Sequence, residues 1–234
     1  MQTLTYAIDF ETYYSKNVGI TEQGLWHYLM HDEFDAYRVS IVGSNGFQFV
    51  GHPKDVDWKM IAEADLWVSH NASFDEPVYH FLQQTGRIDA PEKTPVWHCT
   101  ADLAASLGSP RSLKQAASVL LGVSTSKDVR DAMKGKRWDD MTPEFQADVD
   151  AYALKDAELC LQLWTDWQHE WPEHERLISH QTREMGAEGL AIDRSRVEDA
   201  VKTLRGQIWE AEQNIPWADT DAKSLSPKAL ALEC

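Results

Sequence analysis

A short apolar run that ends in two acids is the feature of this chain that most constrains its fold. Residues 4–8 are largely apolar, and Asp9-Phe10-Glu11 follows them directly. Such a run predicts a buried strand, on which residues two apart share a face, so Asp9 and Glu11 should point the same way. We therefore expect a sheet whose strand end presents two carboxylates to a cleft.

Two further blocks carry acids at regular spacing, Asn71 to Asp75 and Tyr152 to Asp156. The second of these lies in a helical pattern, where residues four apart share a face. Acids gathered in one place repel each other, and such a cluster persists mainly when divalent cations neutralise it. Two metal ions about 4 Å apart on carboxylates are a common device for cutting phosphodiesters. The residues alone thus favour a two-metal site.

The three blocks, read in order as Asp-x-Glu, Asn-x-x-x-Asp and Tyr-x-x-x-Asp, resemble the DEDD family of 3′–5′ exonucleases, in the subclass with tyrosine in the third motif. Residues 152–164 look like the third motif of the proofreading domain of family A DNA polymerases. Residues 184–193 are similar to the segment that leads from that domain into the polymerase, and 223–230 to the next recurring stretch. The opening, 8–13 with 24–28, is similar to bacteriophage members. Histidine-type members, typical of separate proofreading subunits and ribonucleases, carry His where this chain has Tyr152.

The resemblance implies a ribonuclease H-like fold and a role for each acid. Asp9 would bridge two divalent ions, Mg²⁺ or Mn²⁺, and Glu11 and Asp156 would complete the ligands of the first. Asp75 would support the second ion, directly or through water. Tyr152 would orient the attacking water rather than act as a strong base, because a phenol with a pKa near 10 is mostly protonated at neutral pH. Asp9 could instead be a strand-end residue that caps a turn, and each of the other three acids a plain surface residue.

Other positions have two readings each. Tyr152 could be a core tyrosine at helical spacing, and Asn71 could cap a helix or contact the terminal nucleotide. Phe74 could stack on a base or pack in the core. Thr12 could donate to the substrate or satisfy the strand end. Arg111 resembles an arginine that contacts substrate in the family.

The formal net charge of −16 is unusual for a protein that binds DNA, because phosphate contacts usually come from Lys and Arg. Metal ions would offset part of it. Basic residues also gather in one stretch, which is either a solvated loop face or a contact surface for a single-stranded backbone. An acidic exonuclease should bind DNA weakly alone, which fits a domain tethered to a polymerase. The stretch contains Arg111, Lys114, Lys127, Arg130, Lys134, Lys136 and Arg137.

The order of the predicted elements indicates an α/β protein, a mixed sheet covered by helices. Asn45-Gly46 favours a type I′ hairpin turn, and Asp193 can cap a helix. The likeliest boundary is near Pro172, with an exonuclease domain at 1–172 and, at 173–234, a helical linker and the start of a truncated polymerase segment. We expect strands at 3–9, 38–44, 47–51, 66–69, 96–99 and 190–192, helices at 58–64, 74–84, 101–107, 113–121, 145–171, 173–188 and 193–214, and a loop at 122–140.

Composition bears on the compartment. No stretch is long and apolar enough to span a bilayer, and no basic-then-apolar leader precedes the first strand. Three cysteines at no metal-binding spacing favour reduced thiols, and the nine histidines show no paired zinc spacing. We expect a monomeric protein of the cytoplasm of a bacterial or phage-infected cell, without membrane contact.

The expected function is removal of nucleotides from single-stranded or frayed 3′ ends of DNA, as proofreading, with release of 5′-mononucleotides. The polymerase would act in cis or as a separate chain, and the sequence leaves open whether this chain is a fragment. One alternative is an RNA-trimming exonuclease resembling ribonuclease D. The other is a catalytically silent module that holds a polymerase on DNA, which the presence of all four acids, Asp9, Glu11, Asp75 and Asp156, disfavours.

Overall fold

A computed structural model describes residues 3–123 and 128–215 of the chain. The chain divides into two units, residues 1–187 and 188–234, and each is treated by itself. The expected boundary near Pro172 falls inside the first unit. Lys127, Cys234 and the polymerase-like stretch at 223–230 lie outside the described residues.

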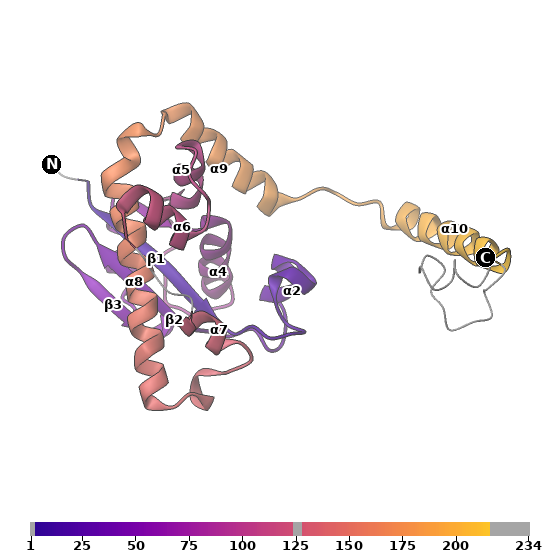
Figure 1. The fold of residues 1–234 in the computed structure, drawn as a ribbon, viewed down its shortest axis with the longest axis horizontal. Coiled ribbons are helices and arrows are strands. Elements are labelled where there is room, and N and C mark those ends of the chain that lie inside the picture. The colour runs from indigo at the N-terminus through magenta and orange to yellow at the C-terminus, as the bar shows by residue number, and fades with distance from the viewer. Residues whose placement is uncertain (1–2, 124–127, 216–234) are drawn as a thin grey trace. The chain divides into compact units, whose positions relative to one another are not determined.

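The first unit is built on a mixed five-stranded sheet in the order β3-β2-β1-β4-β5 (Figure 1). The central strand β1 runs antiparallel to β2 on one side and parallel to β4 on the other. The pair β2 and β3 is antiparallel, and β4 and β5 are parallel. The mixed sheet predicted from the sequence is confirmed. The strands are β1 (Thr5–Thr12), β2 (Ala36–Gly43), β3 (Gln48–Gly51), β4 (Leu66–Ser69) and β5 (Val96–Cys99).

Strand β1 extends further than its apolar run predicted. Pairing with β2 continues past Asp9, which faces Ser40, to Glu11, which faces Arg38, before the register shifts at Thr12. Cross-strand hydrogen bonds thus carry both acids on regular strand backbone. Their shared face, predicted from the spacing, follows from this geometry.

The hairpin between β2 and β3 is present, but the predicted type I′ turn is wrong. That turn needs positive φ at both central residues, and among the described residues only glycines have positive φ. Gly46 has φ 87°, and its N–H donates to the Gly43 carbonyl at 2.9 Å. The side chain of Asn45 accepts from Phe47 N at 3.0 Å, which holds a different, longer turn.

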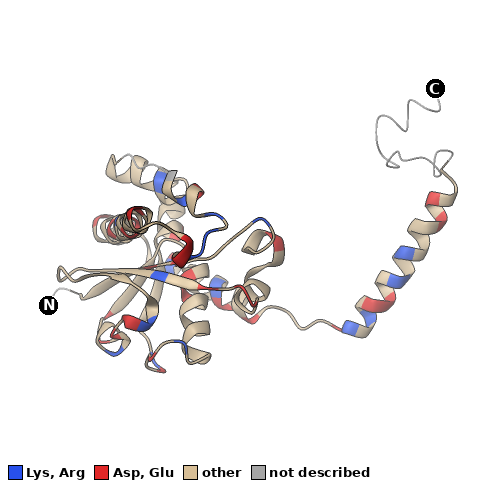
Figure 2. Ribbon diagram, turned by 90° about the horizontal axis from the view of Figure 1, so that it is seen from below, with Lys and Arg blue, Asp and Glu red and all other residues tan. Residues whose placement is uncertain are grey.

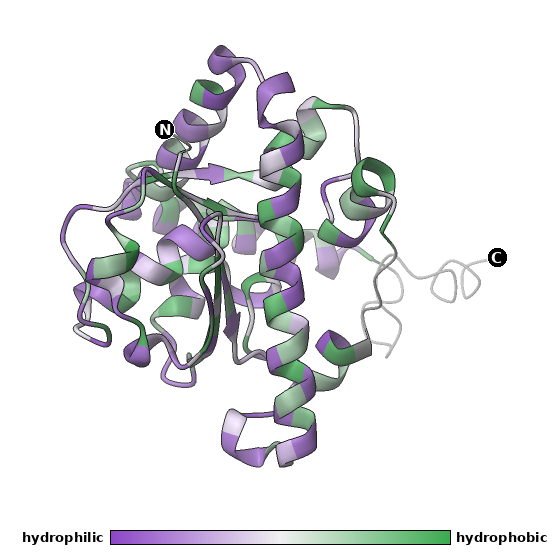
Figure 3. Cartoon of the chain, turned by 90° about the vertical axis from the view of Figure 1, so that its left-hand side faces the viewer, coloured by the Kyte–Doolittle hydropathy of each residue, from purple (hydrophilic) through white to green (hydrophobic). Residues whose placement is uncertain are grey.

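Two helices cover opposite faces of the sheet. On one face, Ala7 of β1 packs with Cys160 and Trp164 of α8 (Pro143–Trp167). On the other, Ile8 of β1 belongs to an aromatic core that includes Tyr79 of α4 (Ala72–Gln84). Figure 3 shows α8 lying across the sheet, with apolar and polar residues alternating along it.

Helix α8 begins earlier than predicted because Thr142 caps it. The Thr142 hydroxyl accepts from Phe145 N at 3.3 Å, and Pro143 takes the first helical position, where its missing N–H costs nothing. The α-helix ends at Trp167, and a 3-10 turn follows over Gln168–Glu170.

The expected loop at 122–140 and the expected strand at 190–192 are both wrong. Helix α7 (Asp128–Met133) and a 3-10 turn (Trp138–Asp140) interrupt the loop. Met133 is buried in the main core, so tertiary packing rather than local propensity forms this helix. Residues 189–193 are irregular, because no neighbouring described strand offers them a ladder.

Helix α9 (Glu173–Glu188) packs on the first unit through Arg183. Its guanidinium donates to the Trp97 carbonyl at 2.7 Å and to Glu76 at 3.3 Å, and Ser179 donates to Asp102 at 2.6 Å. In the second unit, Asp193 caps α10 (Arg194–Gln213) by accepting from Arg196 N at 3.1 Å, as predicted. Residues of both charge signs follow one another along α10 (Figure 2).

The remaining helices are short. Cys99 and Cys160 are free thiols, and both are buried. Of the helices that the structure describes, none combines the length and the apolar character that crossing a bilayer requires. The short helices are α1 (Ile20–Gln23), α2 (Leu25–Leu29), α3 (Trp58–Ile61), α5 (Thr100–Ser106) and α6 (Leu113–Ala116). A π-helical turn at Ala117–Leu121 continues α6.

Candidate functional site

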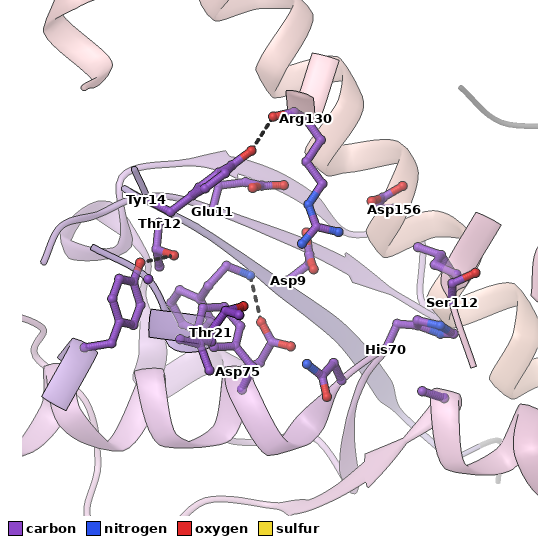
Figure 4. Close-up of a pocket in the computed structure, with 18 of the residues that line it drawn as sticks. Asp9, Glu11, Thr12, Tyr14, Thr21, His70, Asp75, Ser112, Arg130 and Asp156 are labelled. Carbon is purple, nitrogen blue, oxygen red and sulfur yellow. Dashed lines mark hydrogen bonds between the residues drawn. The ribbon is translucent and has the colours of Figure 1, made fainter. Parts of the chain in front are cut away.

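A pocket of about 760 Å³ in the first unit brings together every site residue predicted from the sequence. Its walls come from strand β1, from helices α7 and α8, from the start of α4 and from the loop that precedes α6 (Figure 4). A pocket of this volume is in the usual range for a site that binds a small molecule or a single nucleotide. The predicted residues in its lining are Asp9, Glu11, Thr12, Asn71, Phe74, Asp75, Arg111, Tyr152 and Asp156.

The side chains of Asp9 and Glu11 line the pocket from the C-terminal half of strand β1. Burial, and after it the charges of Glu11, Asp75 and Asp156, raises the pKa of Asp9 well above its ordinary range. Burial, and next the charge of Asp156, raises the pKa of Glu11 to about 8. Both acids are thus held where their ionised form is disfavoured unless a cation joins them.

Asp75 is fixed by hydrogen bonds from two strands. One carboxylate oxygen accepts from Phe10 N of β1 at 3.0 Å, and the other from the hydroxyl of Ser69 at the end of β4. Burial raises the pKa of Asp75 to about 7, although the bonds from Ser69 and Phe10 lower it. Asp75 therefore both joins α4 to the sheet and presents a carboxylate to the pocket.

Tyr152 and Asp156 lie on the face of α8 that lines the pocket, as their spacing predicted. The helix is held in register because Ser40 donates to the Ala153 carbonyl at 2.8 Å and Arg38 pairs with Asp150 at 2.8 Å. Burial, and then the charge of Asp156, raises the pKa of Tyr152 above that of an ordinary phenol. Tyr152 is therefore a neutral hydrogen-bonding group.

The predictions for Asn71, Thr12 and Phe74 have different outcomes. Asn71 occupies the N-cap position of α4, but its side chain makes no cap hydrogen bond, so the capping alternative is wrong; the residue is exposed and lines the pocket. Thr12 is buried and accepts from the Tyr28 hydroxyl at 2.8 Å, which satisfies the strand end. Phe74 is half-buried against the core while another part of it lines the pocket.

Arg111 is held at the pocket rim by Asp102, whose carboxylate lies 2.5 Å from its guanidinium. His70 was missed by the sequence reasoning. Its Nε2 lies 2.8 Å from the Arg111 carbonyl and its Nδ1 2.9 Å from the Thr100 hydroxyl. Because burial lowers the pKa of His70 to about 4, the ring is neutral and donates through Nε2. Its place directly after Ser69 and before Asn71 was the only available signal.

The basic stretch divides between the pocket and the surface near it. Arg111, Lys114, Arg130 and Lys134 line the pocket. Lys136 and Arg137 instead lie over the rings of Phe145 and Tyr13, with the charged atoms 4.5 and 4.4 Å from the ring centres. Four of the basic residues thus lie at the pocket, and their contact with a single-stranded backbone stays a prediction.

The donor chemistry of the pocket suits hard divalent cations, since Asp9, Glu11, Asp75 and Asp156 offer only oxygen. As the side chains are placed, no three His, Cys, Asp or Glu groups of the described residues converge on a common point that could hold an ion. Instead, the guanidinium of Arg130 lies among Asp9, Glu11 and Asp156 (Figure 4). The fit to a metal ion therefore rests on the all-oxygen donor set of the four carboxylates and on their gathering in one pocket.

Comparison with known proteins shows the fold. Neither the protein-family models nor the curated proteins gave a match to the sequence. The structure is similar to the family B DNA polymerase from the hyperthermophilic archaeon Pyrobaculum calidifontis, with a TM-score of 0.53 and 14% identity over 70% of this chain and 24% of that chain. It is similar to the catalytic core of RRP6 from Trypanosoma brucei (mutant C496S), with a TM-score of 0.51 and 17% identity over 77% and 46% of the two chains.

Escherichia coli RNase D, an exoribonuclease involved in structured RNA processing, gives a TM-score of 0.50 and 19% identity over 80% of this chain and 46% of that chain. This chain spans less than half of the length of each of these structures. At these identities the likeness shows a shared fold, and the predicted ribonuclease H-like α/β class is confirmed.

Proposed function

We propose that this chain is a 3′–5′ exonuclease that removes nucleotides from single-stranded or frayed 3′ ends of DNA and releases 5′-mononucleotides. The observation that carries the proposal is the meeting of Asp9, Glu11, Asp75, Asp156 and Tyr152 in one pocket, although they come from three distant segments. Their order resembles the tyrosine subclass of DEDD exonucleases. The fold supports the proposal, because a DNA polymerase and an exoribonuclease share it.

Each acid has a place in the proposed reaction. Asp9, Glu11 and Asp156 would hold one Mg²⁺ or Mn²⁺, and Asp75 would support a second, through water where its bonds to Phe10 and Ser69 persist. Two such ions lower the pKa of a bound water and stabilise the leaving oxygen. The raised pKa values of Glu11 and Asp75 support this assignment, because they mark oxygens that gain most from a cation.

Neutral and basic side chains would position the strand. Tyr152 keeps its proton, so it would orient the attacking water by hydrogen bonding and not remove a proton as a phenolate. Arg111, fixed by Asp102, would hold a phosphate, and Asn71 and Phe74 would contact the terminal nucleotide. A terminal nucleotide must leave its stack to enter such a pocket, and unpairing costs a few kcal/mol. Frayed ends should therefore be cut faster than matched duplex ends.

DNA is the favoured substrate because residues 184–193 resemble the segment that leads into family A polymerases. We infer that a polymerase, in cis or as a separate chain, supplies the affinity that a chain of net charge −16 lacks. RNA trimming is the second candidate, since the fold is shared with RNase D over 80% of this chain.

The test is shortening of DNA and RNA single strands of matched sequence, each labelled at the 5′ end, with the released mononucleotides identified by chromatography. We expect stepwise shortening of the DNA, its loss in excess chelator, and its recovery with Mg²⁺ or Mn²⁺. Asp9→Asn, which removes one ligand charge at constant size, should lower the rate by at least about 10³-fold if the metal site supplies the catalysis. Full activity in chelator, or an active Asp9→Asn variant, would refute the proposal. Faster shortening of RNA would select the second candidate.

A further inference from the structure

Arg130 of α7 sends its side chain into the pocket, and its guanidinium lies among Asp9, Glu11 and Asp156 (Figure 4). The residue as a whole is exposed. Exposed side chains change rotamer within nanoseconds. In the position observed, the charge of Arg130 interacts favourably with Asp9 and Glu11.

The backbone of Arg130 is tied to the segment that follows strand β1. The Tyr14 hydroxyl donates to the Arg130 carbonyl, and Gly135 N donates to the Tyr14 carbonyl at 2.7 Å. Tyr14 follows the end of β1 by two residues, so α7 stays beside the strand that carries Asp9 and Glu11. A guanidinium that leaves the acids would remain at the pocket.

The charges explain why the guanidinium is there. Burial and then the neighbouring acids raise the pKa values of Asp9 and Glu11, and the charge of Arg130 acts against both effects. A divalent ion would bring twice the charge to the same oxygens and would repel the guanidinium at short range. A guanidinium released beside a phosphodiester has a suitable partner, because its donors match two phosphate oxygens at once.

We propose that Arg130 alternates between two partners: it neutralises Asp9 and Glu11 when no metal ion is bound, and it turns to a phosphate of the bound strand when metal ions take its place. The first half concerns this chain and its metal affinity alone. The second half rests on the proposed function.

The first half is tested by Mn²⁺ titration of the protein without nucleic acid, using wild type, Arg130→Gln, Arg130→Lys and Lys134→Gln. Arg130→Gln should bind Mn²⁺ at least about fivefold more tightly, because the competing cation is gone. Lys134→Gln removes an equal charge from the same pocket and should change the Mn²⁺ affinity by less than about twofold. Arg130→Lys keeps the competing positive charge, so its Mn²⁺ affinity should also stay within about twofold of wild type. Equal Mn²⁺ affinity in wild type and Arg130→Gln would overturn the proposal. A melting temperature of the Mn²⁺-loaded variant close to that of wild type shows that it is folded.

The second half is tested by the binding of a fluorescent oligothymidylate in Ca²⁺, measured as anisotropy over a range of salt concentrations. Arg130→Gln should bind more weakly, and the slope of log affinity against log salt should become shallower by about 0.7, the value for one phosphate contact on a single strand. An unchanged slope would remove the phosphate contact from the proposal. A wild type that binds Mn²⁺ but releases no nucleotide would refute the exonuclease and leave the metal titration valid.

Discussion

At the scale of single residues, the pocket concentrates negative charge that the fold does not fully compensate. Glu11 and Asp75 have pKa values raised to about 8 and about 7, and that of Asp9 is also raised. In the unfolded chain these acids titrate near 4. Between the two values the folded protein holds protons that the unfolded chain has released.

This difference predicts that the metal-free protein loses stability as pH rises. Because the folded state binds more protons between about pH 4 and pH 8, the free energy of unfolding falls over that window. The contribution of these acids to that free energy is most favourable at or below about pH 4, and most of that of Glu11 is lost as the pH rises past about 8. Thermal melts in chelator from pH 5 to pH 8.5 should show a falling melting temperature, and the fall should be larger for wild type than for Glu11→Gln.

Two variants test whether the pocket acids cause the fall in melting temperature. Glu11→Gln should make the melting temperature depend less on pH. Glu63→Gln changes an exposed acid outside the pocket and should leave the pH dependence as in wild type. Saturating Mg²⁺ should also flatten it, because the ions hold the carboxylates ionised at both ends of the range. A melting temperature that rises from pH 5 to pH 8 in chelator would contradict the raised pKa values.

Much of the site could be predicted at this scale because it follows local periodicity. The strand spacing placed Asp9 and Glu11 on one face, and the helix spacing did the same for Tyr152 and Asp156. The hydrogen bond from Phe10 N to Asp75 could not be predicted, since it joins residues 65 apart that no local pattern connects.

At the scale of elements, the sequence predicts helices that have a long amphipathic pattern. It does not predict a short helix that forms only through tertiary packing. Strands β4 and β5 have the predicted bounds because each is a short apolar run between polar residues. Helix α7 was read as loop, since six residues rich in charge carry no periodic signal and the burial of Met133 is a tertiary event.

The attachment of α9 depends on Arg183, whose side chain is only 6% exposed and pairs with Glu76 and Asp102. Arg183→Gln should lower the free energy of unfolding of the first unit by about 1 to 3 kcal/mol, because hydrogen bonds to charged groups and to the Trp97 carbonyl are lost. That corresponds to a drop in melting temperature of roughly 2 to 10 °C. Chemical and thermal denaturation would measure both.

The control for this prediction is Arg205→Gln, the same change at an exposed position of α10. It should shift the melting temperature by no more than about 2 °C, as is usual for surface substitutions. If Arg183→Gln is as stable as Arg205→Gln, α9 is not held by these contacts.

At the scale of the molecule, the division into units at residue 187 has a direct test. A chain that ends at Ala187 should keep the melting temperature of the full chain within about 2 °C, and the proposed nuclease activity with it, since no contact of the first unit described above is lost. A chain that ends at Pro172 loses Ser179 and Arg183, and it should melt at least about 5 °C lower.

Equal melting temperatures for the two shortened chains would place the functional boundary near Pro172, as the sequence suggested. A lower melting temperature for the chain that ends at Ala187 than for the full chain would show that residues beyond 187 stabilise the first unit. Circular dichroism melts of the three chains under one buffer distinguish these outcomes.

The central position of β1 has a consequence for synthesis on the ribosome. The first strand to be made is the middle strand of the sheet, and the helix that covers its acidic face arrives much later: the Ser40 hydroxyl that fixes the helix bonds to a carbonyl 113 residues further along the chain. A growing chain cannot assemble the pocket until α8 has left the exit tunnel. The pocket, and any chemistry that depends on it, therefore forms only after the first 167 residues have been made.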